Sequence, residues 1–242
     1  MGLTAYLLIA LKGSVALLIF AVGLDSRLRD LSYLTRRPGV MLRSLLAMYV
    51  LVPLLALSAV KLLQLPTGLE LALVVLAISA GAPMLPRKLM RLGNEEYVIS
   101  LVIVSSLLAI VTVPAWLLLL GPRFDRLEAL DPATVAGVLG KSFLLPMLLG
   151  IAVRWFLPDA SARLSDVLLK FVGIVFSASA LLLLATHWQV VGAILGPPIL
   201  ALGGFTLAAL GIGHLMGGPD PNDRTALAVT CATRHVGVAM VI

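Results

Sequence analysis

Apolar runs long enough to cross a membrane follow one another along almost the whole chain. A membrane-spanning helix needs about 20 mostly apolar residues, and the pattern predicts eight such runs. Their expected bounds are 3–24, 39–63, 69–85, 97–121, 133–157, 165–187, 189–217 and 224–242. Short polar segments such as GGPDPNDR join them. The pattern therefore predicts an all-α, polytopic integral membrane protein with about eight transmembrane helices in a single transmembrane domain, residues 1–242.

Composition agrees with a lipid environment. The 242 residues are 60% hydrophobic and only 12% charged, whereas soluble domains carry about 25% charged residues. A net charge of +6 would suggest nucleic acid in a soluble protein. Here the basic residues lie between the apolar runs, so we expect the lipid bilayer and no nucleic acid as a partner. We predict a multi-pass protein of the cell membrane, such as the bacterial inner membrane, with its oligomeric state left open.

The basic residues also predict an orientation. Segments and span ends on one side of the membrane hold 12 of the 18 Lys and Arg residues, and those on the other side hold four. Cytoplasmic segments carry the excess of positive charge in membrane proteins. The segments after the first, third, fifth and seventh runs are thus expected to be cytoplasmic, which places the N-terminus outside.

The third apolar run contains residues that interrupt a helix. Gly81, Pro83 and Pro86 fall close together at its end, just after Ser79. Proline removes a backbone donor and clashes with the preceding turn, and glycine permits angles that other residues resist. Irregular backbone at membrane depth is tolerated where it lines protein or a watery cavity. The run predicts either a broken helix beside a binding site or a helix that simply ends at Ala82.

Arg234 and His235 lie near the middle of the last run, TALAVTCATRHVGVAMVI. An arginine at the centre of a span costs roughly 2.5–3.5 kcal/mol on insertion scales, so it should face the bundle interior and find a partner there. No acidic residue lies well inside any run, which leaves carbonyls, a solute anion or water as partners. The alternative is a peripheral or re-entrant helix with this pair at the interface. His235 would titrate near neutral pH and offers a route for coupling to protons.

Hydroxyl side chains in two runs are candidates for coupling-ion ligands. They are Ser105, Ser106, Thr230 and Thr233. Serine and threonine in membrane helices also bond back to their own backbone or pack between helices, which is the alternative. Asp220 and Asp223 invite a metal-binding interpretation, but two aspartates are too few for a clustered motif. Asp223 is expected to cap the last helix, and no metal site is predicted.

The interrupted third run and the polar eighth run are five elements apart. Transporters built from inverted repeats place interrupted helices at matching positions of their two halves, with the solute and coupling ion between them. A repeat with an odd number of helices is inverted automatically in its second copy. The spacing therefore suits inverted repeats of five helices each.

Several stretches together resemble the bile acid:sodium symporter family and its bacterial relatives. They are FAVGLDSRLRDLSYLTRRPGVMLRSLLAMYVLVPLLA, LPTGLELALVVLAISAGAP, RLGNEEYVISLVIVSSLLAIVTVP and TALAVTCATRHVGVAM. The resemblance implies a panel and a core, with two unwound helices crossing in the core. It assigns 1–34 and 133–187 to the panel and 39–121 and 189–242 to the core. It also implies that the chain lacks the family's first helix and is truncated in the ninth.

The resemblance does not carry the family's site residues over unchanged. Met84 and Leu85 stand where the family has Ser-Asn, and Thr230, Arg234 and His235 stand where it has Glu and Gln-Asn. A sodium site prefers a carboxylate, and the fixed charge of Arg234 would repel a sodium ion, so the residues argue against the sodium coupling that the family implies. Na⁺ and H⁺ both stay open as coupling ions, and no other cofactor is expected. The predicted solute-binding residues are Ser79, Gly81, Pro83, Pro86, Arg234, His235 and Gly237.

These residues favour a secondary transporter of an organic anion or small amphipathic solute. In this hypothesis Arg234 binds the anion in two places at once, or instead replaces the sodium ion as a tethered cation. The alternative function is a membrane sensor or structural partner that kept the fold without transport. No Gly-x-Ser-x-Gly or His-Glu-x-x-His pattern is present, so the sequence does not predict an enzyme. The identity of the solute is not encoded in any recognisable motif.

Overall fold

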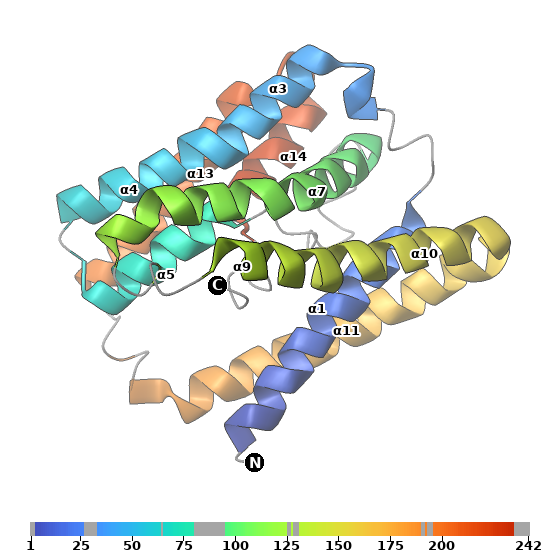
Figure 1. The fold of residues 1–242 in the computed structure, drawn as a ribbon, viewed down its shortest axis with the longest axis horizontal. Helices are drawn as coiled ribbons and strands as arrows, with labels where there is room; N and C mark the ends of the chain where they lie inside the picture. Colours follow the sequence, from blue (N-terminus) through green and yellow to red (C-terminus); the bar gives the residue numbers. More distant parts are fainter. Residues whose placement is uncertain are drawn as a thin grey trace. The chain divides into compact units, whose positions relative to one another are not determined.

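The part of the chain that this computed structural model describes is built from helices (Figure 1). It comprises residues 3–26, 33–63, 65–79, 95–124, 127, 131–189, 192 and 196–234. Six helices within these ranges are long and apolar enough to cross a membrane. They are Tyr6–Asp25, Pro38–Leu63, Glu96–Arg123, Pro132–Phe156, Pro158–Thr186 and Pro198–Met216. The chain is therefore a multi-pass membrane protein, and each of the six lies within or close to one of the predicted runs.

Two of the six spans contain a π-helical segment. The first consists of α3 (Pro38–Leu46), the π-helical residues Ala47–Leu51 and α4 (Val52–Leu63). The second consists of α9 (Pro132–Leu139), the π-helical residues Gly140–Leu144 and α10 (Leu145–Phe156). In both spans a proline, Pro53 or Pro146, stands two residues after the π-helical segment. Proline has no N–H and clashes with the carbonyl four residues earlier, so a local widening of the helix at these places has a simple cause.

The third and eighth predicted runs form short helices in their described parts. Helix α5 (Thr67–Ile78) and helix α14 (Pro221–Ala232) have 12 residues each. At 1.5 Å per residue, such a helix covers about 18 Å of the roughly 30 Å hydrocarbon layer.

The observed ends correct two expectations. Helix α5 ends at Ile78, not at Ala82 or later, and the backbone of Ser79 is extended. The expected helix over 224–242 ends already at Ala232, so Arg234 does not lie inside a helix.

The chain divides into two compact units, and the first consists of 1–27 and 142–200. In it α1 (Leu3–Asp25) packs against α10 and α11 (Pro158–Thr186). The backbones of α1 and α10 touch at Gly23 and Gly150, where an added Cβ on either would collide with the backbone of the other helix. Only glycine permits this approach, because it lacks a Cβ.

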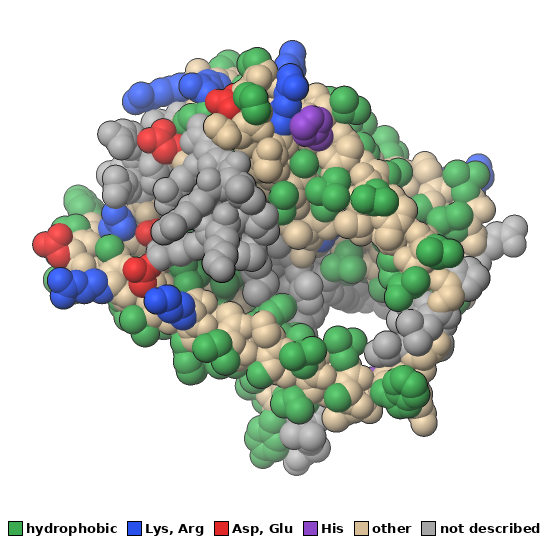
Figure 2. Space-filling model, turned by 180° about the vertical axis from the view of Figure 1, so that it is seen from behind, with side chains coloured by type: hydrophobic (Ala, Val, Ile, Leu, Met, Phe, Trp, Pro, Cys, Tyr) green, Lys and Arg blue, Asp and Glu red, His purple; other side chains and the backbone are tan. Residues whose placement is uncertain are grey.

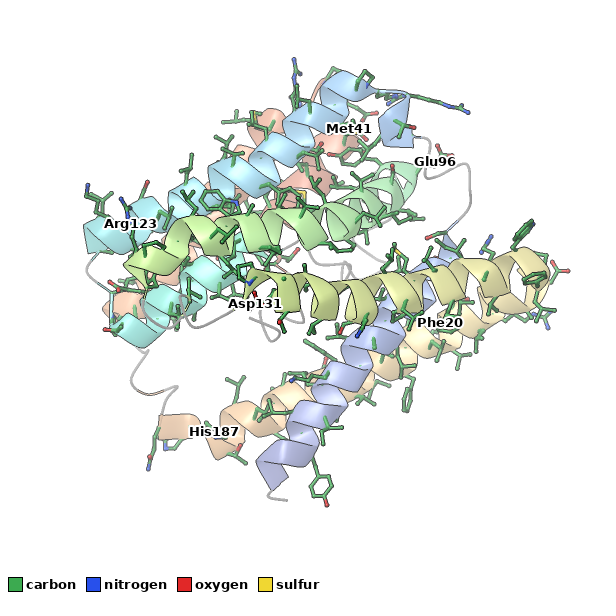
Figure 3. All side chains as sticks on the ribbon, in the orientation of Figure 1. Phe20, Met41, Glu96, Arg123, Asp131 and His187 are labelled. Atoms are coloured by element: carbon green, nitrogen blue, oxygen red, sulfur yellow. The ribbon has the colours of Figure 1, made fainter. Side chains whose placement is uncertain are left out.

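The second unit consists of 28–141 and 201–242. Helix α7 (Glu95–Leu120) packs against α3, α5, α9 and α14. It runs in the same direction as α3 and α4, since Ser44 is bonded to Tyr97 and Tyr49 to the later residue Ser105. Figure 3 marks the beginnings of both elements at Met41 and Glu96. Most of α13 (Pro197–Met216) also belongs to this unit and approaches α14 closely, because an added Cβ on Gly213 would lie 2.5 Å from Ala228 Cα.

Large apolar side chains are exposed on most of the long helices. Examples are Leu118, Trp155, Phe156, Ile174 and Leu200, all more than two thirds exposed. Figure 2 shows such side chains spread over the drawn face, with Lys and Arg gathered in separate places. Exposed apolar surface on this scale is unfavourable in water and matches a hydrocarbon surrounding.

Candidate functional site

Arg234 is buried although it carries a permanent charge. It lies two residues beyond the end of α14, after Thr233, whose backbone is extended. Its side chain is 8% exposed. A buried arginine must find hydrogen-bond acceptors, because its charged form is costly to remove from water. The side chain points into the protein, toward α5 and the π-helical segment Ala47–Leu51.

The acceptors of the Arg234 guanidinium are backbone carbonyls from two other elements. Nη2 donates to the carbonyl oxygen of Met48 at 2.8 Å and also to that of Ala77. Nε donates to the carbonyl oxygen of Leu76 at 3.3 Å. One side chain thus joins the end of α14 to the end of α5 and to the π-helical segment Ala47–Leu51.

The early end of α5 explains why two of these carbonyls are accessible. The last four carbonyls of an α-helix have no donor four residues later in the helix, and Leu76 and Ala77 belong to the last turn of α5. The Leu76 carbonyl also accepts from the N–H of Ser79 at 3.2 Å, and its oxygen has a second lone pair. The helix dipole also places a partial negative charge at this end, which favours a cation there. Arg234 therefore occupies a position that the geometry of α5 prepares for positive charge.

The third carbonyl is released by the π-helical segment and Pro53. In a regular α-helix the Met48 carbonyl would accept from the N–H of Val52, but that N–H donates to Ala47. The next residue, Pro53, has no N–H to offer. The Met48 carbonyl is left for Arg234. This is a local consequence of sequence, and π-helical insertions in α-helices are often found at functional sites.

The neighbouring carbonyl, that of Tyr49, also lacks a backbone donor, because the residue four positions later is Pro53, which has no N–H. It accepts from Trp116 Nε1 of α7 at 2.9 Å. The Tyr49 hydroxyl donates to the Ser105 carbonyl, also on α7. Helix α7 therefore holds the π-helical segment in place beside Arg234.

The remaining guanidinium nitrogen, Nη1, is buried and has no hydrogen-bond partner among the described residues. Buried donors without a partner are uncommon and costly, about 1–3 kcal/mol or more for a charged group. The acceptors of the other two nitrogens are neutral, so the group retains its full positive charge. Nη1 can therefore donate to an anion that enters the site.

The predicted site residues divide into three groups. Ser79 is brought close to Arg234, because its Oγ donates at 2.6 Å to the same Leu76 carbonyl that accepts from Arg234 Nε. Five predicted residues lie outside the described residues: Gly81, Pro83, Pro86, His235 and Gly237.

The four hydroxyl candidates form the third group. The hydroxyls of Ser105, Thr230 and Thr233 all donate to carbonyls of their own helices. Ser105, Ser106 and Thr230 are buried, and Thr233 is exposed. The backbone-bonded alternative therefore describes three of the hydroxyl groups, although their oxygen lone pairs can still accept.

A second polar cluster lies at the start of α14. The hydroxyl of Tyr33 donates to both carboxylate oxygens of Asp223, at 3.1 and 3.4 Å. Arg37 Nη1 donates to the Tyr33 hydroxyl and lies 3.9 Å from an Asp223 oxygen. Burial and the adjacent Asp223 carboxylate raise the pKa of Tyr33 to about 12. The cluster joins the segment before α3 to the first turn of α14.

This cluster corrects the expected role of Asp223. The cap of α14 is Asp220, whose side chain accepts from the N–H of Asn222 at 2.8 Å. Asp223 is instead 2% exposed and bonded to Tyr33. The described residues contain no group of three or more His, Cys, Asp and Glu side chains that could hold a metal ion.

The chain was compared with known protein families. A model described as "Sodium Bile acid symporter family" matches residues 14–195, about three quarters of the 242-residue chain. The matched stretch contains Met48, Leu76 and Ala77, whereas Arg234 lies beyond it. A search of curated proteins finds no significant match.

Proposed function

The chain belongs to the sodium bile acid symporter family, and on this premise we propose that it moves a small organic anion or similar amphipathic solute across the membrane by alternating access. Family membership implies a secondary transporter and not an enzyme. The solute class is our inference from the site. The observation that carries it is the burial of the Arg234 guanidinium beside the end of a half-length helix.

The charge of the site favours an anion. Arg234 keeps a net positive charge among neutral carbonyls, and its Nη1 is without a partner among the described residues. A carboxylate or sulfonate that binds Nη1 would form a charge-assisted hydrogen bond in a surrounding of low dielectric constant. The family's name refers to bile acids, which are amphipathic organic anions, so this chemistry suits the family.

We further propose that α5 and α14 are the two crossing, interrupted helices of incomplete inverted repeats. Their lengths of 12 residues each, and the link between their ends through Arg234, support this assignment. Residues 39–121 and 189–242 would form the core and 1–34 and 133–187 the panel. The charge distribution supports an orientation with the N-terminus outside.

The test is uptake into liposomes that contain the purified chain. Radiolabelled taurocholate and a set of simple aliphatic carboxylates and sulfonates serve as probes, under imposed Na⁺, pH or no gradients. Loss of a charged hydrogen bond of about 1.5–3 kcal/mol predicts that Arg234→Ala lowers anion uptake roughly 10- to 100-fold.

Arg224→Ala is the matched control. Arg224 lies in the first turns of α14 and also donates to a carbonyl, that of Gly218 at 2.6 Å, whereas Arg234 follows the other end of this helix. Equal uptake by wild type and Arg234→Ala would contradict the proposed site. Solute binding without flux in the wild type would favour the alternative of a sensor that kept the transporter fold.

A further inference from the structure

We propose that the Arg234 guanidinium fills a binding site for a monovalent cation, so that the protein carries this cation covalently attached and needs no bound sodium. The inference rests on the proposed transport function for its meaning in coupling, but the cation site itself can be tested without any solute. It follows from the atoms around the guanidinium, from the helix ends beside it, and from what its removal would leave behind.

The atoms around the guanidinium are those that a metal cation of group 1 would use. Three carbonyl oxygens, from Met48, Leu76 and Ala77, converge on Nε and Nη2 of one side chain. Backbone carbonyls are hard oxygen ligands, and rings of them replace the hydration shell of cations in channels. None of the three can supply a proton, so the site accepts only a donor or a positive ion.

The ends of two helices add to this preference. The C-terminal end of α5 supplies two of the three carbonyls, and α14 ends only two residues before Arg234. Each helix C-terminus is equivalent to about −0.5 of an elementary charge, so one cation matches two such ends. In transporters with discontinuous helices, C-terminal ends and unwound carbonyls are the places where a coupling cation is coordinated.

Removal of the guanidinium would leave these oxygens buried. Met48 and Ala77 are 0% exposed, so water outside the protein cannot reach them directly. Arg234→Ala would also leave the space of the lost side chain beside them. The Oγ of Ser79, which shares the Leu76 carbonyl with Arg234, keeps its lone pairs for a further contact. A sodium ion with one or two waters suits the charge and the ligand type of this place.

A purely structural role for Arg234 gives a different expectation. If the guanidinium served only to tie α5 to α14, its loss would destabilise the protein equally in every salt. If it fills a cation site, the loss is compensated by a small cation in solution and by no large one. The dependence of stability on the nature of the cation therefore separates the two roles.

The experiment measures the unfolding temperature of the purified full chain in detergent, in NaCl and in choline chloride at equal ionic strength. We expect the wild type to unfold within about 1 °C of the same temperature in both salts. For Arg234→Ala we expect a lower unfolding temperature than for the wild type in choline. Sodium at 100 times its Kd should raise the unfolding temperature of this variant by on the order of 5 °C.

Two further variants sharpen the test. Arg234→Met is uncharged, but its long side chain occupies the space, so it should be destabilised without a response to sodium. Arg224→Ala removes the carbonyl-bound arginine at the other end of α14. Its unfolding temperature should be the same in NaCl and in choline chloride. Methylguanidinium, a soluble analogue of the lost group, should stabilise Arg234→Ala and leave Arg234→Met unchanged.

The proposal is overturned if sodium stabilises the wild type as much as Arg234→Ala, or if Arg234→Ala unfolds at the same temperature in sodium and choline. If Arg234→Ala cannot be purified in choline, its recovery in sodium or methylguanidinium supports the proposal, and failure in both overturns it. Sodium stabilisation of Arg234→Ala together with anion uptake equal to that of the wild type would retain the cation site while contradicting the proposed solute site.

Discussion

The phenol of Tyr33 donates to the buried carboxylate of Asp223 at 3.1 Å and joins residues 190 positions apart in the chain. This bond fixes the start of α14, while Arg234 fixes its end. Helix α14 is thus held at both ends by side-chain hydrogen bonds of charged groups, and its position beside α5 depends on both.

The first prediction is that Tyr33→Phe destabilises the protein by about 1–3 kcal/mol, because the buried Asp223 carboxylate loses a donor. Thermal unfolding in detergent measures the effect. Tyr6→Phe is the matched control, since Tyr6 is 60% exposed on α1. Equal unfolding temperatures for the two variants would show that the bond contributes nothing to stability.

The second prediction concerns the pH dependence of the cap at Asp131, the residue labelled at the start of α9 in Figure 3. Its carboxylate accepts from the N–H of Thr134 at 2.9 Å, and this bonding to Thr134 lowers the pKa of Asp131 below 3.8. A lowered pKa means that the ionised form stabilises the fold above pH 4, and that this contribution is lost as the pH falls through the folded-state value.

Asp131→Ala should therefore lower the unfolding temperature at pH 7 and lower it less at pH 3. Asp131→Asn keeps an acceptor that does not titrate, so its difference from Asp131→Ala should not change with pH. A wild-type advantage over Asp131→Ala that is the same at both pH values would contradict the assignment.

The third prediction concerns Pro53. Pro53→Ala restores an N–H that can donate to the Tyr49 or Met48 carbonyl, in competition with Trp116 or Arg234. We expect the fluorescence emission of Trp116 to shift when its hydrogen bond is lost, measured with the other two tryptophans, Trp155 and Trp188, replaced by Phe.

Pro146→Ala is the control for this measurement, because Pro146 has the same place after the other π-helical segment. It should leave the Trp116 emission unchanged. Identical emission for the Pro53 variant and its parent would mean that the proline does not release the carbonyls.

The fourth prediction compares two glycines of the same span. Gly150→Ala places a Cβ against the backbone of α1, and overpacking of this kind costs about 1–3 kcal/mol or more. Gly137→Ala meets no atom within 4 Å and should stabilise its helix by up to about 1 kcal/mol. Unfolding temperatures that move in the same direction for both would contradict the close contact of α1 with α10.

Much of the fold could be predicted from apolar runs, because lipid requires whole helices with their backbone bonds satisfied internally. The end of α5 could not. The residues that interrupt the run, Gly81 and Pro83, lie three and five positions beyond the observed end at Ile78, and no glycine or proline stands at Ile78 or Ser79. The sequence predicts a start at residue 165, later than the observed start of α11 at Pro158, because Asp159 in the first turn and Arg163 in the second are typical of a loop.

The surroundings of Arg234 could be predicted only in part. The lack of carboxylates inside the runs left carbonyls, an anion or water for Arg234, and the structure places three carbonyls there. The sequence does not reveal which carbonyls accept from Arg234, because backbone carbonyls are common to all residues. Pro53 is the exception, since it removes a backbone donor from its own helix. The pairing of Tyr33 with Asp223 depends on tertiary contact between distant segments, which periodicity within a helix does not reveal.

The 13 positions from Pro221 to Arg234 have an electrical consequence. If α14 enters the membrane at Pro221, its 12 residues carry the chain about 18 Å along the helix axis, and the charge of Arg234 just beyond its end then lies within the membrane's electric field. Any rearrangement that changes its depth moves charge through that field, worth up to about 2.3 kcal/mol per 100 mV for a full crossing. The resting voltage of the cell would then bias which side of the membrane the protein opens toward.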